Sequence, residues 1–299
     1  MMVAENNVTT YIVVTPVKDE ERYIAYTLES VISQTVTPLR WVLVDDGSTD
    51  MTGKIIHSYI YNYAWISYIR IERNEERILG AAEIKAFSLG YDSVRQLDHG
   101  YVVKLDADLI LPSNYFEQML YRFDSNPRLG IASGIYLEKK NQSWNPVILP
   151  QYHAAGAAKM ASVACFRAIG GFPLSPGWDT VDEIKAWTCG WETAHFPEIK
   201  FHHLKTEGSA MGSLRMNYFH GEIYYVSGGS VLFFIGKLLH RMVAGTPPFV
   251  AGVMLFCGCL HAFLSRRPKL VSLREEAYYK RLLNRRFVEQ LTSKLFHRA

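Results

Sequence analysis

The chain has 299 residues, 48% of them hydrophobic, and a formal net charge of +3. That much apolar sequence can bury a full core, so the composition excludes a disordered chain. The small net charge gives no support for nucleic acid as a partner, because proteins that follow a phosphate backbone concentrate basic residues on one face. The four cysteines follow no zinc-ligand spacing.

The first hundred residues alternate between strand and helix patterns. Residues 11–15 form a β-branched and aromatic run, which is typical of a strand buried on both faces. Apolar residues then recur at helical spacing over 20–34. The further predicted elements are strands at 39–44, 67–71 and 101–103 and helices at 52–63 and 81–97. This alternation predicts an open α/β sheet that binds ligands at the carboxyl ends of its strands.

Two carboxylates follow the strand predicted at 101–103. Asp106 and Asp108 are separated by one residue, and side chains at i and i+2 of an extended segment point to the same side. Both can therefore face one divalent cation that carries an anionic ligand. The alternative is a solvated strand end, since acidic residues are common in turns.

The second half of the chain is predicted from shorter patterns. Helices are expected at 115–123, at 157–169 and from about Thr180, with strands at 130–137 and 198–201. Residues 231–239 combine apolar residues with Lys237, which predicts an amphipathic helix in a membrane interface. The apolar run at 249–264 is shorter than the ~20 residues of a standard membrane span. We therefore prefer a monotopic or re-entrant hairpin over a transmembrane helix, with a buried helix pair or a dimer interface as the soluble alternative.

The acidic motifs occur in a recognisable order. The string Val44-Asp45-Asp46-Gly47-Ser48-Thr49-Asp50 precedes Asp106-Ala107-Asp108 and then Asp182-Glu183. Over residues 11–206 this order resembles the family 2 glycosyltransferases of the GT-A fold. The resemblance implies an inverting, metal-dependent, hexosyltransferase-like enzyme with a GT-A type open mixed sheet flanked by helices. The expected domains are a catalytic domain at 1–215 and a helical, membrane-associated region at 216–299.

The resemblance also implies a nucleotide site. Asp46 is expected to accept a hydrogen bond from an N–H of the base, although helix capping is the alternative. The predicted contacts with base, ribose and diphosphate are Thr15, Pro16, Val17, Glu20, Asp46, Lys85 and Asp106.

A divalent metal site is implied next to the nucleotide. Asp108 is expected to ligate Mg²⁺ or Mn²⁺ directly and Asp106 to support it, since both ions prefer oxygen ligands. His203 is preferred over His202 as a further ligand, against the alternative that neither histidine meets a metal.

Inverting transfer also needs a base that removes the proton of the acceptor hydroxyl. Asp182 and Glu183 lie near a predicted helix start, which favours an ionised carboxylate. Many relatives carry Glu-Asp with the second residue as the base, whereas this chain has Asp-Glu. The choice stays open, with Asp182 preferred and helix capping as the alternative.

The expected function is transfer of a sugar from a UDP- or GDP-linked donor to a hydroxyl of a glycan or a polyprenyl- or other lipid-linked acceptor. The polar segment 1–10 lacks the apolar core of a signal peptide, so the expected location is the cytoplasmic face of the cell membrane. One alternative, a metal-dependent nucleotidyltransferase, would need a basic, glycine-rich loop after the first strand, whereas 15–20 is glycine-free. The other, a catalytically silent membrane scaffold, should have lost one of the acidic motifs.

Overall fold

The computed structural model describes residues 10–72, 81–205 and 212–296. The chain divides into two compact units, residues 1–206 and 207–299, which are described separately below. The domain boundary predicted between residues 215 and 216 lies inside helix α7 (Ser213–Val226). The prediction that no signal peptide is present rests on residues 1–10, of which 1–9 lie outside the described part of the chain.

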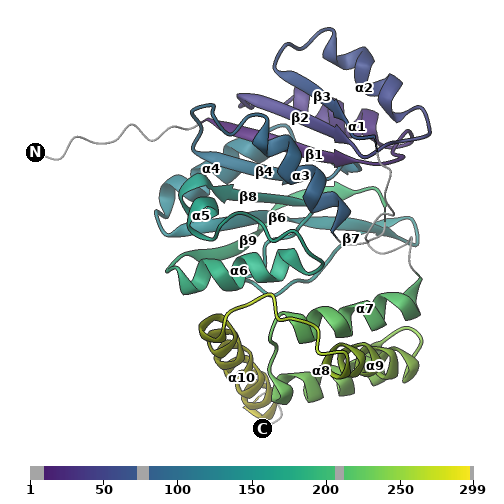
Figure 1. Cartoon of the computed structure of the whole chain (residues 1–299), viewed down its shortest axis with the longest axis vertical. Helices are drawn as coiled ribbons and strands as arrows, with labels where there is room; N and C mark the ends of the chain where they lie inside the picture. Colours follow the sequence, from purple (N-terminus) through teal and green to yellow (C-terminus); the bar gives the residue numbers. More distant parts are fainter. Residues whose placement is uncertain (1–9, 73–80, 206–211, 297–299) are drawn as a thin grey trace, which may run out of the picture. The chain divides into compact units, whose positions relative to one another are not determined.

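The first unit is built on a mixed sheet with the strand order β3-β2-β1-β4-β8-β6-β9-β5, in which β7 pairs with β6 (Figure 1). The strands are β1 (Tyr11–Val17), β2 (Arg40–Asp45), β3 (Ile66–Arg70), β4 (Tyr101–Leu105), β5 (Leu109–Ile110), β6 (Leu129–Lys140), β7 (Ser143–Pro146), β8 (Ala158–Ser162) and β9 (Glu192–His203). Strands β1 to β4 run parallel, whereas β8 is antiparallel to its neighbours β4 and β6. The predicted open α/β sheet is thus confirmed as a mixed one.

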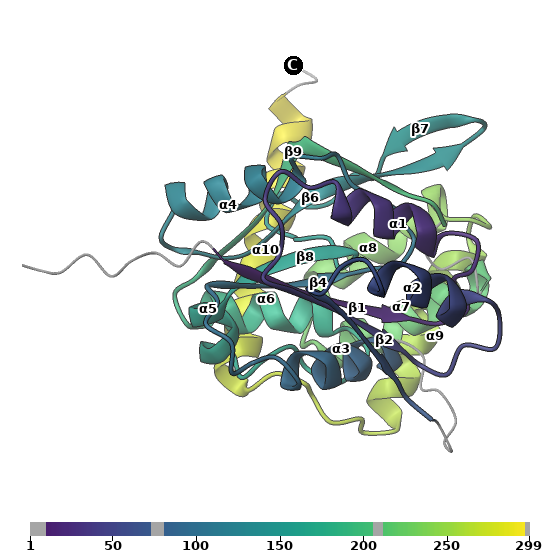
Figure 2. The ribbon, with the colours of Figure 1, turned by 90° about the horizontal axis from the view of Figure 1, so that it is seen from above.

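Side chains of β1 alternate between the two faces of the sheet. Tyr11 and Val13 belong to one buried cluster, and Ile12 and Val14 belong to the other. The helices of this unit are α1 (Ile24–Ile32), α2 (Thr52–Ile60), α3 (Ala82–Asp92), α4 (Tyr115–Ser125), α5 (Val163–Ala168) and α6 (Trp178–Thr188). Helices α1, α2 and α4 pack on the first face, and α3, α5 and α6 on the second (Figure 2). A core on both faces explains why β1 reads as a continuous apolar run.

One predicted helix is wrong. The segment predicted as a helix over 157–169 begins with strand β8, which pairs with β4 from Tyr101↔Ser162 to Leu105↔Ala158. Only the second half is helical, in α5, where Ser162 Oγ accepts a hydrogen bond from Cys165 N (3.2 Å). Sheet pairing overrides the helix propensity of the alanines here, and the capping serine marks the true helix start.

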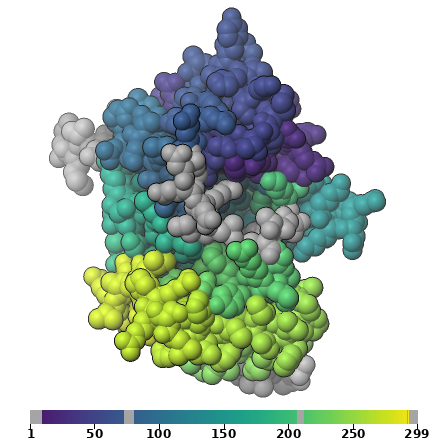
Figure 3. All heavy atoms as spheres, turned by 45° about the vertical axis from the view of Figure 1, so that its right-hand side comes forward, coloured from purple at the N-terminus to yellow at the C-terminus, as the bar shows by residue number. Residues whose placement is uncertain are grey.

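Strands β6 and β7 form a hairpin that projects from the first unit (Figure 3, teal). All four residues of β7 are exposed. The sequence patterns did not predict β7 or the two-residue strand β5. Neither is long enough to show a clear alternation of apolar residues.

The second unit contains four helices within the described residues: α7, α8 (Val231–Ala244), α9 (Val250–Leu264) and α10 (Leu273–Phe296). Helices α7 and α9 approach each other very closely. A Cβ on Gly258 would lie 1.9 Å from the carbonyl oxygen of Tyr218, and one on Gly221 would lie 2.0 Å from that of Leu255. None of the described helices has both the length and the apolar character needed to cross a bilayer.

Candidate active site

Two loops at the carboxyl edge of the sheet are held together by hydrogen bonds. Ser48 Oγ accepts from the Asp19 amide (3.0 Å), and Thr52 Oγ1 accepts from the Glu20 amide (2.7 Å). The N-cap of α2, Met51, has no side-chain capping bond. The polar string after β2 therefore fastens the β1–α1 loop in place.

The two aspartates after β2 have different surroundings. Asp45 is fully buried, and its carboxylate accepts hydrogen bonds from Ser48 N (2.6 Å) and Arg70 Nη1 (3.0 Å). Asp46 is the first residue after β2, and its amide donates to Val17 O (2.9 Å). Asp45 therefore shapes the turn, while Asp46, which is 4% exposed, stays a predicted contact with the base.

The first strand contributes backbone to the same edge. Thr15 is fully buried, and its Oγ1 accepts from Trp41 Nε1 (2.9 Å). Val17 is 2% exposed, whereas Pro16 is partly exposed. Of the three predicted backbone contacts, Pro16 is thus the most accessible.

Asp106, Asp108 and His203 form a cluster that could hold a metal ion. One potential ligand atom from each residue lies within 4.8 Å of the others, and His203 Nε2 is 3.3 Å from Asp108 Oδ1. Pairing of β5 with β9 places Leu109 opposite His203, which brings that histidine beside Asp108. The two carboxylates are the ligand type that Mn²⁺ and Mg²⁺ prefer, and the imidazole is a ligand more typical of transition metals.

His202 has a different position. Its ring lies 4.4 Å from that of Trp144 in the projecting hairpin. Successive side chains of a strand point to opposite faces. The acidic cluster thus includes His203, the histidine preferred from the sequence.

Glu20 lies beside the acidic cluster. It pairs with Lys205, and its Oε2 is buried and accepts no hydrogen bond from any described residue. Burial raises the pKa of Glu20 to about 7 despite Lys205, and the charges of Asp108 and Asp106 add to the rise. An extra cation nearby would favour the ionised form.

Two residues that the sequence analysis did not identify, Lys104 and Glu83, lie next to the acidic cluster. Lys104 is buried in β4, pairs with Asp106, and lies 3.9 Å from Glu83 of α3. Burial raises the pKa of Asp106 to about 6, against the opposing charge of Lys104. The sequence did contain a sign of this residue, because Lys104 is a charged side chain within the otherwise apolar strand 101–105. Lys85, the predicted contact on α3, is exposed.

Both residues proposed as the base lie in α6, where Asp182 is 0% and Glu183 1% exposed. Asp182 pairs with Lys159 (2.9 Å) and Glu183 with His153 (3.0 Å). Burial raises the pKa of the Asp182 carboxyl, and Lys159 opposes the rise. Asp179, which the sequence analysis did not consider as a base, lies in the first turn of α6 and is partly exposed.

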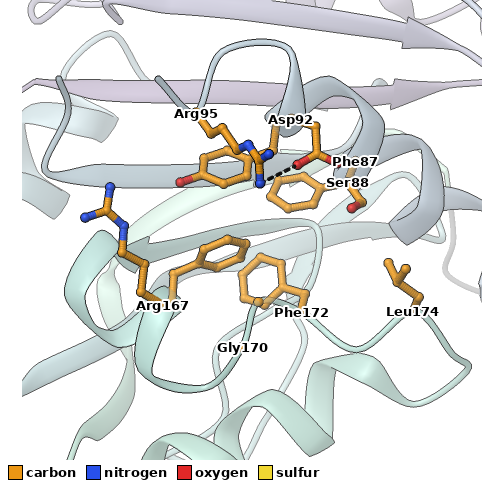
Figure 4. A pocket seen from close by; sticks show the side chains of 11 residues that line it. Phe87, Ser88, Asp92, Arg95, Arg167, Gly170, Phe172 and Leu174 are labelled. Atoms are coloured by element: carbon orange, nitrogen blue, oxygen red, sulfur yellow. Dashed lines mark ion pairs between the residues drawn. The ribbon is translucent and has the colours of Figure 1, made fainter. Parts of the chain in front are cut away.

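A separate hollow lies between α3 and the loop after α5 (Figure 4). Its volume is about 360 Å³, and it contains none of the predicted site residues. Phe87, Phe166 and Phe172 line it, and Arg95 on its rim pairs with Asp92 (3.5 Å). The hollow and the acidic cluster thus have no lining residue in common.

A comparison with protein families identifies the chain. The family model described as glycosyl transferase family 2 matches residues 12–168, which is more than half of the chain. The chain belongs to glycosyl transferase family 2. The match covers β1 from Ile12 onward, the loop after β2, and the Asp106–Asp108 pair.

Curated relatives match a shorter stretch of this family 2 chain. A poly-β-1,6-N-acetyl-D-glucosamine synthase of Staphylococcus epidermidis is 28% identical over 116 residues, 39% of this chain and 26% of the relative. The synthase of Staphylococcus aureus strain COL is 27% identical with the same coverage. The aligned part of the chain therefore spans only 26% of the length of these relatives.

Solved structures of similar fold are more distant in sequence. The mannosyltransferase PcManGT of Pyrobaculum calidifontis, in complex with GDP-Man and Mn²⁺, gives a TM-score of 0.57 at 15% identity, covering 86% of this chain and 88% of that one. GalNAc-T7 with UDP, GalNAc and Mn²⁺ gives 0.59 at 17% identity, covering 80% and 52%. TarS of S. aureus gives 0.50 at 16% identity, covering 89% and 46%. These similarities show that the family 2 chain has a GT-A-like fold.

Proposed function

We propose that the protein is an inverting, metal-dependent glycosyltransferase that uses a UDP- or GDP-linked sugar. The observation that carries the proposal is the Asp106–Asp108–His203 cluster beside a carboxyl edge of the sheet in a chain of glycosyl transferase family 2. A nucleoside diphosphate is an anion, and such a donor needs positive charge beside its two phosphates. A divalent cation held by this cluster would neutralise the diphosphate as it leaves.

The chain's own residues divide the remaining tasks. Asp46, which is 4% exposed, and the partly exposed Pro16 are the proposed contacts with the base. The ion pair with Lys104 holds the Asp106 carboxylate in place, so the acidic cluster is ordered before a donor binds. A carboxylate of α6 receives the proton of the acceptor hydroxyl while the oxygen attacks the anomeric carbon from the side opposite the diphosphate, which leaves with the electron pair of the broken bond.

The proposed acceptor is a hydroxyl of a glycan or of a lipid-linked glycan at the cytoplasmic face of the membrane. The support is an apolar stripe on α8, formed by residues spaced about four apart. Its most exposed members are Val231, Ile235, Leu239 and Val243. Arg241 on the same helix and Arg266 after α9 would favour an anionic lipid surface.

The first test is a panel of UDP- and GDP-linked sugars incubated with the protein and Mn²⁺. We expect one donor to be cleaved and the activity to disappear with EDTA and return with added Mn²⁺. Asp108→Asn should weaken Mn²⁺ binding by at least about tenfold, because a charged ligand is lost. Asp92→Asn, which changes an acid of the separate hollow, is the matched control and should bind Mn²⁺ as the wild type does.

Two results would contradict the proposal. If no nucleotide sugar is bound or cleaved, the donor class is wrong. If cleavage proceeds unchanged in EDTA and in Asp108→Asn, the metal role of the cluster is wrong.

A further inference from the structure

Two acidic side chains of helix α6, Asp182 and Glu183, have both carboxylate oxygens in hydrogen bonds or ion pairs within the protein. Asp182 Oδ2 accepts from Lys159 Nζ (2.9 Å) and its Oδ1 from Glu183 N (2.7 Å). Glu183 Oε1 accepts from Ala154 N (2.7 Å), and its Oε2 lies 3.0 Å from His153 Nδ1. With exposed fractions of 0% and 1%, neither carboxylate can meet an acceptor hydroxyl without breaking these bonds.

Asp179 has the opposite environment. It lies in the first turn of α6, is partly exposed, and its carboxylate accepts no hydrogen bond from the described residues. A carboxylate in the first turn is favoured in its ionised form by the helix dipole. A base must combine these two properties, charge and access.

Asp179 also lies close to the acidic cluster through the backbone before β8. A Cβ built on Gly156 would be 3.7 Å from the Cβ of Asp179. The next residue, Ala157, accepts a hydrogen bond at its carbonyl oxygen from Asp106 N (2.8 Å). Two consecutive residues thus connect the first turn of α6 with the metal cluster.

Lys159 holds the first turn of α6 by hydrogen bonds. Its fully buried Nζ donates to the carbonyl oxygen of Asp179 (2.8 Å) as well as to Asp182. The Trp178 ring is close to two lysines, with Lys159 Nζ 5.1 Å and Lys104 Nζ 5.3 Å from its centroid. A continuous set of contacts therefore joins the α6 turn to the residue that holds Asp106.

We propose that Asp179 is the catalytic base of the transfer and that Lys159 and Asp182 are positioning residues that hold its helix turn. The assignment rests on the proposed function. In the step, the acceptor oxygen forms a bond to the anomeric carbon while its proton passes to the Asp179 carboxylate. The bond from that carbon to the diphosphate oxygen breaks, and its electron pair leaves with the nucleoside diphosphate.

The test compares variants of the full chain with the donor that the panel identifies. Asp179→Asn should lower kcat by about 10²- to 10⁴-fold, the usual contribution of a general base, and leave the donor KM within about threefold. Asp179→Glu should restore part of the loss. Asp182→Asn should keep kcat within about tenfold of the wild type, since its amide oxygen still accepts from Lys159 and only the bond from Glu183 N is lost.

A second variant covers the case in which Asp182→Asn does not fold. Replacing both partners, in Lys159→Met/Asp182→Leu, removes the buried charge together with its counter-charge, which proteins often tolerate. If Asp182 were the base, the double variant would lack the base and would stay inactive. Activity of this double variant above that of Asp179→Asn therefore supports a positioning role for Asp182.

The failures of the two proposals are distinguishable. A wild-type protein that transfers no sugar overturns the proposed function and this assignment with it. If the wild type is active, wild-type kcat in Asp179→Asn overturns the assignment alone. It is also overturned if every folded variant at position 182 is as inactive as Asp179→Asn.

Discussion

Neighbouring carboxylates of this chain have different surroundings because their oxygens meet different partners. Asp45 accepts hydrogen bonds from Ser48 and Arg70 inside the sheet, whereas Asp46 comes after the last residue of β2. On α6, Asp182 is held by Lys159 while Asp179 reaches solvent. At the residue scale, burial and hydrogen bonding therefore distinguish the partly exposed Asp179 from the fully buried Asp182.

His99 provides a prediction of pH dependence. Burial lowers its pKa, although the Leu97 carbonyl, 2.6 Å from Nδ1, favours the charged form. The unfolded chain, with an ordinary pKa of about 6.5, then binds the proton more readily. The stability from neutral His99 is thus complete above about pH 6.5 and is lost as pH falls towards the lower folded pKa.

The measurement is urea unfolding of the wild type and His99→Gln between pH 7.5 and pH 5, followed by tryptophan fluorescence. All six tryptophans lie in the first unit, so the signal reports that unit alone. The stability advantage of the wild type over the variant should shrink as pH falls. Ser93→Ala, a non-titrating change nearby, should give a constant difference. A constant difference for His99→Gln as well would contradict the prediction.

The strand-end motifs were predictable from the sequence because they follow continuous apolar runs. The pairing partners of these acids were not predictable. Lys104 and Lys159 face each other across β4 and β8, and β8 had been predicted as part of a helix. Without that strand, the sequence offered no reason to place Lys159 beside Asp182.

At the element scale, the position of α3 depends on a glycine. A Cβ on Gly90 would lie 2.6 Å from methyl groups of both Val14 and Val44, on neighbouring strands of the sheet. The helix can rest directly on β1 and β2 because this side chain is missing. The packing of these strands in turn supports the loops that carry Glu20 and Asp46.

We therefore expect Gly90→Ala to destabilise the first unit. Alanine gains about 1 kcal/mol of helix propensity over glycine, but overpacking a close-packed core costs about 1–3 kcal/mol. The expected net loss in free energy of unfolding is about 1 kcal/mol, measured by urea unfolding with tryptophan fluorescence. Leu89→Ala changes the adjacent exposed residue and is the control for effects on the helix alone. Stabilisation by Gly90→Ala would mean that propensity outweighs the contact.

At the scale of the whole molecule, the chain combines a family 2 fold with a second helical unit. Sequence composition indicated the apolar helices at α8 and α9, and the structure adds which side chains remain exposed. On α9 these include Phe256, Leu260, Phe263 and Leu264. Exposed apolar stripes on two helices of one unit are unusual for a surface that meets only water.

Vesicle binding tests whether these stripes contact a bilayer. The full chain should sediment with vesicles that contain phosphatidylglycerol, and binding should weaken with salt because part of the attraction is electrostatic. The triple variant Ile235→Ser/Leu239→Ser/Val243→Ser should bind at least about tenfold more weakly, since burying each such side chain is worth up to about 1.5–3 kcal/mol. The matched control, Tyr61→Ser/Tyr121→Ser/Ile148→Ser, removes three exposed apolar residues of the first unit and should bind as the wild type does. A wild type that stays in solution as a dimer, and that the α8 changes convert to a monomer, would assign the stripe to a second copy of the chain and contradict the membrane proposal.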